Sequence, residues 1–201
     1  MPALPSPRDP LFPGRCPTCR MPPFACFCSQ VRAVPTRTRV LVVRHAAEIN
    51  KTSNTGRLAH LLLSNSALVD HGVERQPVDL TGHLGDRPFV LAAGATPLVD
   101  PPEVSTLVVI DSTWATAKSM RWRIPPLPSV PTLSLPAPVL APLRMRRGTE
   151  PEQMATIEAI AAALDFLGEP EPAAHLRALF ATMSERLRTL RGFDVPAKVR
   201  R

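Results

Sequence analysis

The stretch Thr106-Leu107-Val108-Val109-Ile110 decides the fold, because an unbroken apolar and β-branched run is typical of a strand buried on both faces of a parallel sheet. The run stops at Asp111-Ser112-Thr113-Trp114, so we expect a turn at Asp111 and a helix over residues 113–121. A strand that leads through a polar turn into a helix is the repeating unit of α/β proteins.

The rest of the chain continues this alternation of strands and helices. The patterns predict strands at 38–44, 66–69, 88–92 and 132–135, and helices at 54–64, 154–167 and 173–190. Gly168 and Gly192 follow the last two helices, where glycine is a frequent stop signal. We therefore expect an α/β fold with a mainly parallel sheet flanked by helices.

The 201 residues suffice for one sizeable core. We expect a flexible arm at 1–13, a small cysteine-rich unit at 14–36, and an α/β domain at 37–201 that forms one structural unit with it. No apolar run approaches a membrane span, and the N-terminus has no apolar signal sequence. The expected location is the cytoplasm, with no membrane partner.

The charge balance favours a nucleic-acid partner. Lys and Arg number 24 against 17 Asp and Glu, which gives a net charge of +7, and arginine dominates the cations. Arginine forms forked hydrogen bonds with phosphate, so this balance suits RNA. The alternative explanation is a GC-rich genome, which favours arginine codons whatever the protein binds.

The four cysteines of the chain all lie within residues 16–28, in the pattern C-x2-C-x6-C-x-C. Four thiolates complete a tetrahedral zinc shell, and C-x2-C is a common half-site. With no coordination position left for water, the expected zinc site is structural. Two pairs of free or redox-active thiols remain the alternative. The expected metal ligands are Cys16, Cys19, Cys26 and Cys28.

Polar residues follow three of the predicted strands: Arg44-His45, Gly94 and Asp111. Ligands of parallel α/β sheets bind beyond the carboxyl ends of strands, so these residues are candidates for one shared pocket. Ser53 or Asn54 is expected to cap the helix that follows the first strand.

The order of these motifs along the chain resembles the DTW-domain family. The cysteine pattern is followed by R-H-x-x-E at 44–48, S-N-T-G at 53–56, I-D-x-T-W at 110–114 and T-I-E-A at 156–159. The resemblance spans about residues 16–165. Ser112 stands where the family usually has glycine, and serine lacks the access of glycine to positive φ. Ala92-Ala93-Gly94 stands where the family tends to have an aromatic-Pro pair.

The resemblance implies a tRNA-uridine aminocarboxypropyltransferase, with residues 37–201 as the catalytic domain. Such an enzyme transfers the 3-amino-3-carboxypropyl group of S-adenosylmethionine (SAM) to N3 of a tRNA uridine and releases methylthioadenosine. It also implies a SPOUT-like fold, in which the chain can form a knot. We expect SAM as co-substrate, a structural Zn²⁺, tRNA as partner and a monomeric protein.

The residues assigned to catalysis are Asp111, Thr113 and Trp114. Asp111 can act as the base for N3 or orient the uridine, and its alternative role is to cap the following helix. Trp114 can stack on a base, and its alternative place is the core.

Most of the residues assigned to the cofactor come from the same motifs, as do Arg44 and His45 of the RNA set, which are expected to contact phosphate or the uracil. The other RNA-set arginines form an expected phosphate-binding surface that flanks the proline-rich segment 124–142. The alternative roles of the two sets are helix capping and an ordinary solvated surface, and a lone histidine is more often structural than catalytic. The cofactor set is Glu48, Ser53, Asn54, Thr55, Gly56, Ala92, Gly94, Ile110, Asp111, Ser112, Thr156 and Glu158. The RNA set is Arg44, His45, Arg121, Arg123, Arg144, Arg146 and Arg147.

Two rival functions fit the same motifs. One is a SAM-dependent RNA methyltransferase, which would release S-adenosylhomocysteine. The other is a zinc-containing RNA-binding protein without catalysis, for which the acids Asp111 and Glu48 would have no use.

Overall fold

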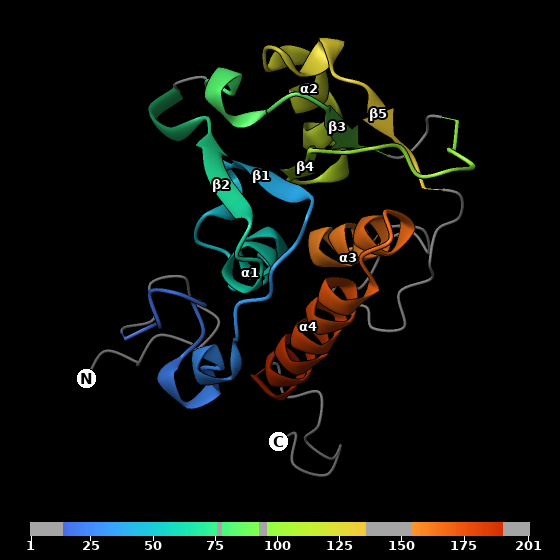
Figure 1. Ribbon diagram of the computed structural model, residues 1–201. Helices are drawn as coiled ribbons and strands as arrows, with labels where there is room; N and C mark the ends of the chain where they lie inside the picture. Colours follow the sequence, from blue (N-terminus) through green and yellow to red (C-terminus); the bar gives the residue numbers. More distant parts are fainter. Residues whose placement is uncertain (1–13, 76–77, 93–95, 136–153, 191–201) are drawn as a thin grey trace.

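A single parallel sheet organises the protein (Figure 1). The computed structural model describes residues 14–75, 78–92, 96–135 and 154–190. The strand order is β2-β1-β4-β3-β5, and every pairing is parallel. The strands are β1 Arg39–His45, β2 Ser66–His71, β3 Pro88–Leu91, β4 Thr106–Asp111 and β5 Thr132–Leu133. The expected α/β class with a parallel sheet flanked by helices is confirmed.

The described ranges also contain four α-helices and several 3-10 turns. They are η1 Pro23–Ala25, η2 Cys28–Gln30, η3 Ala46–Glu48, α1 Thr55–Leu62, η4 Val73–Arg75, η5 Thr81–His83, α2 Trp114–Arg123, η6 Leu127–Ser129, α3 Thr156–Phe166 and α4 Pro170–Leu190. Helix α4 begins at Pro170, before the expected start at residue 173. The added turn contains Pro170 and Pro172, and the first turn of a helix accepts proline because its backbone N–H groups have no partner within the helix.

The sheet separates two layers of helices (Figure 1). Val40 and Val42 of β1 belong to one core with residues of α1, α3 and α4, whereas Leu41 and Val43 belong to a second core with Met120 of α2. All four β1 side chains are fully buried. Successive strand residues point to opposite faces, so burial on both faces requires the unbroken apolar run seen in the sequence.

The cysteine-rich segment packs into the first of these cores. Cys19, Met21 and Phe27 are buried there with residues of α1 and α4. Val34 also forms a parallel bridge with Leu63, just after α1. The expected boundaries at residues 13 and 36 stay predictions, and the arm at 1–13 and the stop at Gly192 lie outside the described residues.

The chain runs outward from the centre of the sheet in two directions. From β1 it passes through α1 to β2 on one side, and from β4 it passes through α2 to β5 on the other. The carboxyl ends of β1 and β4 therefore flank a topological switch point, where ligands of such sheets bind. The expected knot depends on the path of residues 136–153, which lie outside the described residues. None of the helices in the described ranges is long and apolar enough to span a membrane.

Candidate functional site

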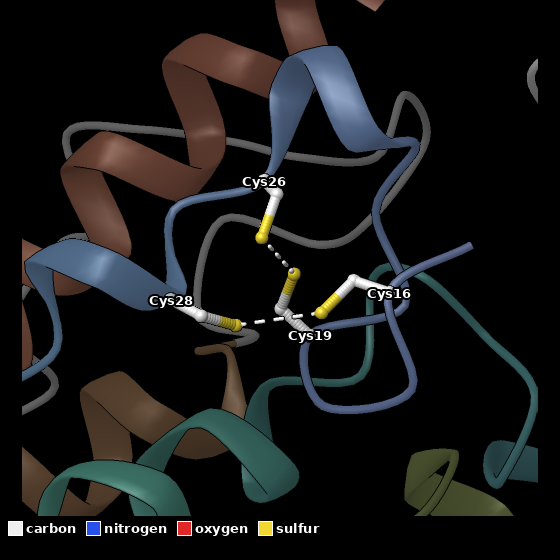
Figure 2. Close-up of side chains that lie close together, drawn as sticks. All are labelled: Cys16, Cys19, Cys26 and Cys28. Atoms are coloured by element: carbon white, nitrogen blue, oxygen red, sulfur yellow. Dashed lines mark hydrogen bonds between the residues drawn. The ribbon is translucent and has the colours of Figure 1, made fainter. Parts of the chain in front are cut away.

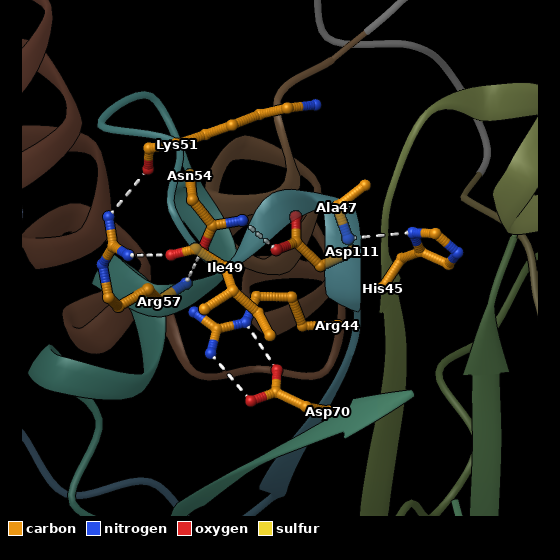
Figure 3. Close-up of polar contacts among 9 residues, drawn as sticks. All are labelled: Arg44, His45, Ala47, Ile49, Lys51, Asn54, Arg57, Asp70 and Asp111. Carbon is orange, nitrogen blue, oxygen red and sulfur yellow. Dashed lines mark hydrogen bonds and ion pairs between the residues drawn. The ribbon is translucent and has the colours of Figure 1, made fainter. Parts of the chain in front are cut away.

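Asp111, the last residue of β4, lies at the switch point with only 4% of its surface exposed. One carboxylate oxygen, Oδ1, accepts a hydrogen bond of 2.7 Å from the hydroxyl of Thr156 on α3. The other, Oδ2, accepts one from the side-chain amide of Asn54 (Figure 3). Asn54 and Thr156 lie 57 and 45 residues from Asp111 in the sequence. The carboxylate is thus held by groups at the starts of two helices that are distant from it along the chain.

Asn54 joins this carboxylate to the start of α1. Its Oδ1 accepts the backbone N–H of Arg57 at 2.9 Å, which makes it the N-cap, and its Nδ2 donates to Asp111 (Figure 3). Asparagine carries an acceptor and a donor, whereas aspartate could cap the helix but could not donate to a carboxylate. Of the two expected caps, Asn54 is the one used. Ser53 precedes it and is partly exposed, and Thr55 is buried.

Burial raises the pKa of Asp111 above that of an exposed aspartate, because the charged form loses its hydration. The hydrogen bonds from Thr156 and Asn54 and the positive charge of Arg44 counteract this rise, while the negative charge of Glu48 adds to it. The result is a carboxylate that accepts a proton more readily than a solvated one and is fixed in direction.

Arg57 fixes the loop that precedes α1, although it was not among the residues expected at the site. Its guanidinium donates to the carbonyls of Ile49 at 3.0 Å and Lys51 at 2.9 Å (Figure 3). Burial, and then repulsion from Arg44, lowers its pKa to about 10, so it stays cationic at neutral pH. The available signal was an arginine one residue after S-N-T-G, beside the apolar stripe of α1.

Glu48 lies in the same loop, buried at 5% exposure, and its carboxylate pairs with the ammonium of Lys51 at 2.5 Å. Glu158 accepts the backbone N–H of Ala155 at 2.9 Å at the start of α3, which matches the capping role left open above. Burial raises the pKa of Glu158. In the T-I-E-A motif, Thr156 therefore contacts Asp111, whereas Glu158 caps the helix.

Arg44 was expected to contact RNA, and its contacts in the structure are with the protein itself. The side chain is buried and forms a forked pair with Asp70 of β2, with N–O distances of 2.7 and 3.0 Å (Figure 3). The sheet register places Arg44 between Asp70 and Asp111. A buried guanidinium needs hydrogen-bond acceptors or an opposite charge, and both neighbouring strands supply an acid near Arg44.

Arg121 was expected on a phosphate-binding surface, but its side chain is buried. It is 8% exposed, and its guanidinium donates to the carbonyl oxygens of Leu127 and Val130. It thereby holds the segment after α2, including η6, against the helix. Arg123 is exposed. The remaining expected RNA-binding arginines, Arg144, Arg146 and Arg147, and the expected cofactor residue Gly94 lie outside the described residues.

The turn after β4 differs in part from expectation. The hydroxyl of Thr113 accepts the N–H of Thr116 at 3.4 Å and caps α2, so Asp111 is not the cap. Trp114 is 48% exposed, which excludes a place in the core. Positive φ outside glycine occurs, in the described part of the chain, only at Arg20 and Glu74. Ser112 therefore needs no glycine-like conformation here.

The other expected residues lie around this centre. Ile110 faces the second core, opposite to Asp111, and Ala92 follows β3, where its N–H donates to the Leu133 carbonyl at 3.1 Å. His45 accepts the N–H of Ala47 at 3.2 Å (Figure 3), and its ring centre lies 6.4 Å from that of His71. The structure thus gathers Asn54, Gly56 and Thr156 around Asp111 and leaves His45 on the other face of the sheet.

The four cysteines form a second candidate site, for a metal ion (Figure 2). Their sulfur atoms all lie within 4.8 Å of one another, with 3.6 Å between Cys16 and Cys28 and 3.7 Å between Cys19 and Cys26. A tetrahedral zinc with bonds of about 2.3 Å requires sulfur separations of roughly 3.8 Å. The cluster therefore has the size and donor set to hold such an ion.

The fold is that of an α/β protein with a parallel sheet, and Asp111 marks a candidate ligand site at its switch point. The family model of the DTW domain matches residues 14–188, so the chain belongs to the DTW-domain family. A solved structure described as the SAM-dependent rRNA:acp-transferase Tsr3 from Vulcanisaeta distributa has a similar fold. The two are 19% identical with a TM-score of 0.51, over 79% of this chain and 81% of that one.

Proposed function

We propose that this protein is a SAM-dependent aminocarboxypropyltransferase whose acceptor is N3 of a tRNA uridine. Membership of the DTW-domain family and the likeness to an enzyme described as a SAM-dependent rRNA:acp-transferase support the reaction class. The observation that carries the proposal is the Asp111 carboxylate, buried at the switch point and aimed by Asn54 and Thr156.

Asp111 is the base in this proposal. N3 of uridine is a poor nucleophile while protonated, so a nearby base is needed. As the N3 lone pair forms a bond to the Cγ of the aminocarboxypropyl chain, the bond from that carbon to the sulfonium sulfur breaks. The N3 proton passes to the Asp111 carboxylate, and methylthioadenosine leaves. Burial raises the pKa of Asp111, which favours the proton transfer.

The surrounding residues position the reactants. The sulfonium is already a good leaving group, so the protein contributes chiefly alignment. The first turn of α1, with the closely packed Thr55 and Gly56, and the turn at Ser112 flank the carboxylate. Their backbone N–H groups would hold the carboxylate of SAM. Glu48, buried in the adjacent loop, would hold its ammonium.

Zinc at the cysteine cluster would have a structural role. Its four ligands leave no open coordination position, and the segment that carries them packs against α1 and α4. Loaded with metal, the segment would fix the end of α1 remote from Asn54.

The test is to incubate the purified protein with SAM and unmodified tRNA, and in parallel with ribosomal RNA, and to identify the products by mass spectrometry. Aminocarboxypropyluridine in tRNA with release of methylthioadenosine is expected. Asp111→Asn should lower the rate by about 10²- to 10⁴-fold, the usual contribution of a general base. The control, Asp79→Asn, alters an exposed carboxylate that accepts the Thr81 N–H and should be silent.

Other results would exclude part or all of this proposal and favour a different function. Modification of ribosomal RNA alone would keep the reaction and change the acceptor. A methylated nucleoside with S-adenosylhomocysteine would make the protein a methyltransferase. RNA binding that survives Asp111→Asn, without any SAM-derived product or SAM affinity, would make it a binding protein.

A further inference from the structure

Both tryptophans of the chain lie on α2, and both are exposed: Trp114 by 48% and Trp122 by 61%. Tryptophan is on average a highly buried residue, so large exposed rings mark an interaction surface. Trp114, Lys118 and Trp122 are spaced by four residues and therefore follow one side of the helix. We call this side, together with Arg123, the α2 platform.

The opposite side of α2 is fixed to the protein. Met120 and the C-cap residue Ile124 are buried in the second core. Arg121 donates to the carbonyls of Leu127 and Val130, and its guanidinium carbon lies 5.2 Å from the ring centre of Trp122. The Trp122 ring thus rests against an anchored cation, so little conformational freedom remains to be lost when a partner binds.

The charge of the platform indicates the class of partner. Helix α2 contains Lys118, Arg121 and Arg123 and no acidic residue. Exposed aromatic rings combined with cations are the surface that unpaired nucleic-acid bases recognise, by stacking on the rings and pairing phosphates with the cations. A two-fold contact between two copies of the platform would instead bring two positively charged patches together.

We propose that Trp122, supported by Lys118 and Arg123, stacks on an unpaired base of the RNA substrate at a distance from the reacting uridine. Trp114 opens the helix three residues after Asp111, and Trp122 lies about 12 Å further along its axis. The platform thus extends from the reaction centre and would hold a nucleotide that flanks the modified one. This inference rests on the proposed RNA-modifying function and adds an RNA-recognition site to it.

The experiment measures the affinity of the full-length Trp122→Ala variant for unmodified tRNA and, separately, for SAM. Removal of one stacking ring should weaken tRNA binding about 10-fold, since stacked bases contribute about 1–3 kcal/mol each. SAM affinity should not change. Trp122→Phe should retain most of the tRNA affinity, and Lys118→Ala should reduce the slope of log affinity against log salt by about 1. The matched control is Phe24→Ala, which removes a 69% exposed ring from the cysteine-rich segment.

Two outcomes would overturn the proposal that Trp122 stacks on RNA. One is that the Trp122→Ala variant binds and modifies tRNA as well as the parent protein does. The other is a parent protein that is dimeric and becomes monomeric in this variant with its tRNA affinity intact. The two proposals can fail separately. If tRNA binding depends on Trp122 but no aminocarboxypropyl group is transferred, the platform is supported and the proposed reaction is excluded. Thermal unfolding of Trp122→Phe and Trp122→Ala shows whether both variants are folded.

Discussion

Gly56 of α1 lies against the carboxylate of Asp111 so closely that a Cβ on Gly56 would be 2.6 Å from both Cγ and Oδ2 of the aspartate. Gly56 does not have a positive φ, so glycine is required here for space and not for backbone freedom. The S-N-T-G motif therefore acts through two residues: Asn54 donates to the carboxylate, and Gly56 leaves room for it.

Replacement of Gly56 by alanine should displace Asp111. Alanine normally stabilises a helix interior by about 1 kcal/mol relative to glycine, so any fall in the unfolding midpoint would come from the clash. We expect at least a 10-fold loss of transfer rate, since a base misplaced by about 1 Å loses much of its effect. Gly82→Ala is the control, because nothing lies within 4 Å of its Cβ position. Equal rates for both variants would contradict the contact.

Loss of the Thr156 hydroxyl should shift the pH dependence of the reaction. The hydroxyl donates to Asp111 and favours its charged form, so Thr156→Val raises the pKa of Asp111 further. A base works only when ionised, hence the acidic limb of the kcat/KM profile should move to higher pH. Thr156→Ser keeps the donor and should leave the limb in place. A shift toward lower pH in Thr156→Val would exclude Asp111 as the titrating base.

The cysteine cluster should bind one metal ion per chain and stabilise the fold. Cys19 is buried in the core that also contains α1 and α4, so removal of the ion should loosen this side of the sheet. Chelation or Cys19→Ser should abolish the metal content measured by atomic emission and lower the unfolding midpoint. The exposed neighbour Thr18 provides the control as Thr18→Ala. Full stability with four free thiols and no metal would refute a structural metal.

Arg44→Ala should destabilise the protein whether or not RNA is present. It removes the ion-pair partner of Asp70 and one of the positive charges near Asp111. Breaking a fully buried pair costs about 3 kcal/mol or more, and the partial exposure of Asp70 reduces this to an expected loss of about 1–3 kcal/mol. Urea unfolding measures this loss. Arg87→Ala breaks the exposed pair with Glu103 and should cost about 1 kcal/mol or less. Parent-like stability combined with weak RNA binding would instead favour the expected contact between Arg44 and RNA.

The secondary structure was readable from the sequence because its signals are local. The apolar runs at β1 and β4 require burial on both faces, and the glycine after α3 ends that helix in a left-handed conformation at φ +76°. The cysteine spacing likewise predicted a compact cluster, because the residues between the ligands are few. The position of Asp111 at the end of a strand was enough to nominate it.

What the side chains do at the site was decided by tertiary structure. Arg44 and Arg121 were assigned to RNA because of their charge. In the structure both side chains are buried, where Arg44 pairs with an acid and Arg121 donates to backbone carbonyls of a neighbouring segment. Asn54 and Thr156 meet at Asp111 only because α1 and α3 begin beside the end of β4. A buried charge needs hydrogen-bond or ion-pair partners, and the fold supplies them from residues that are distant in the sequence. The local sequence pattern does not indicate which distant residues these are.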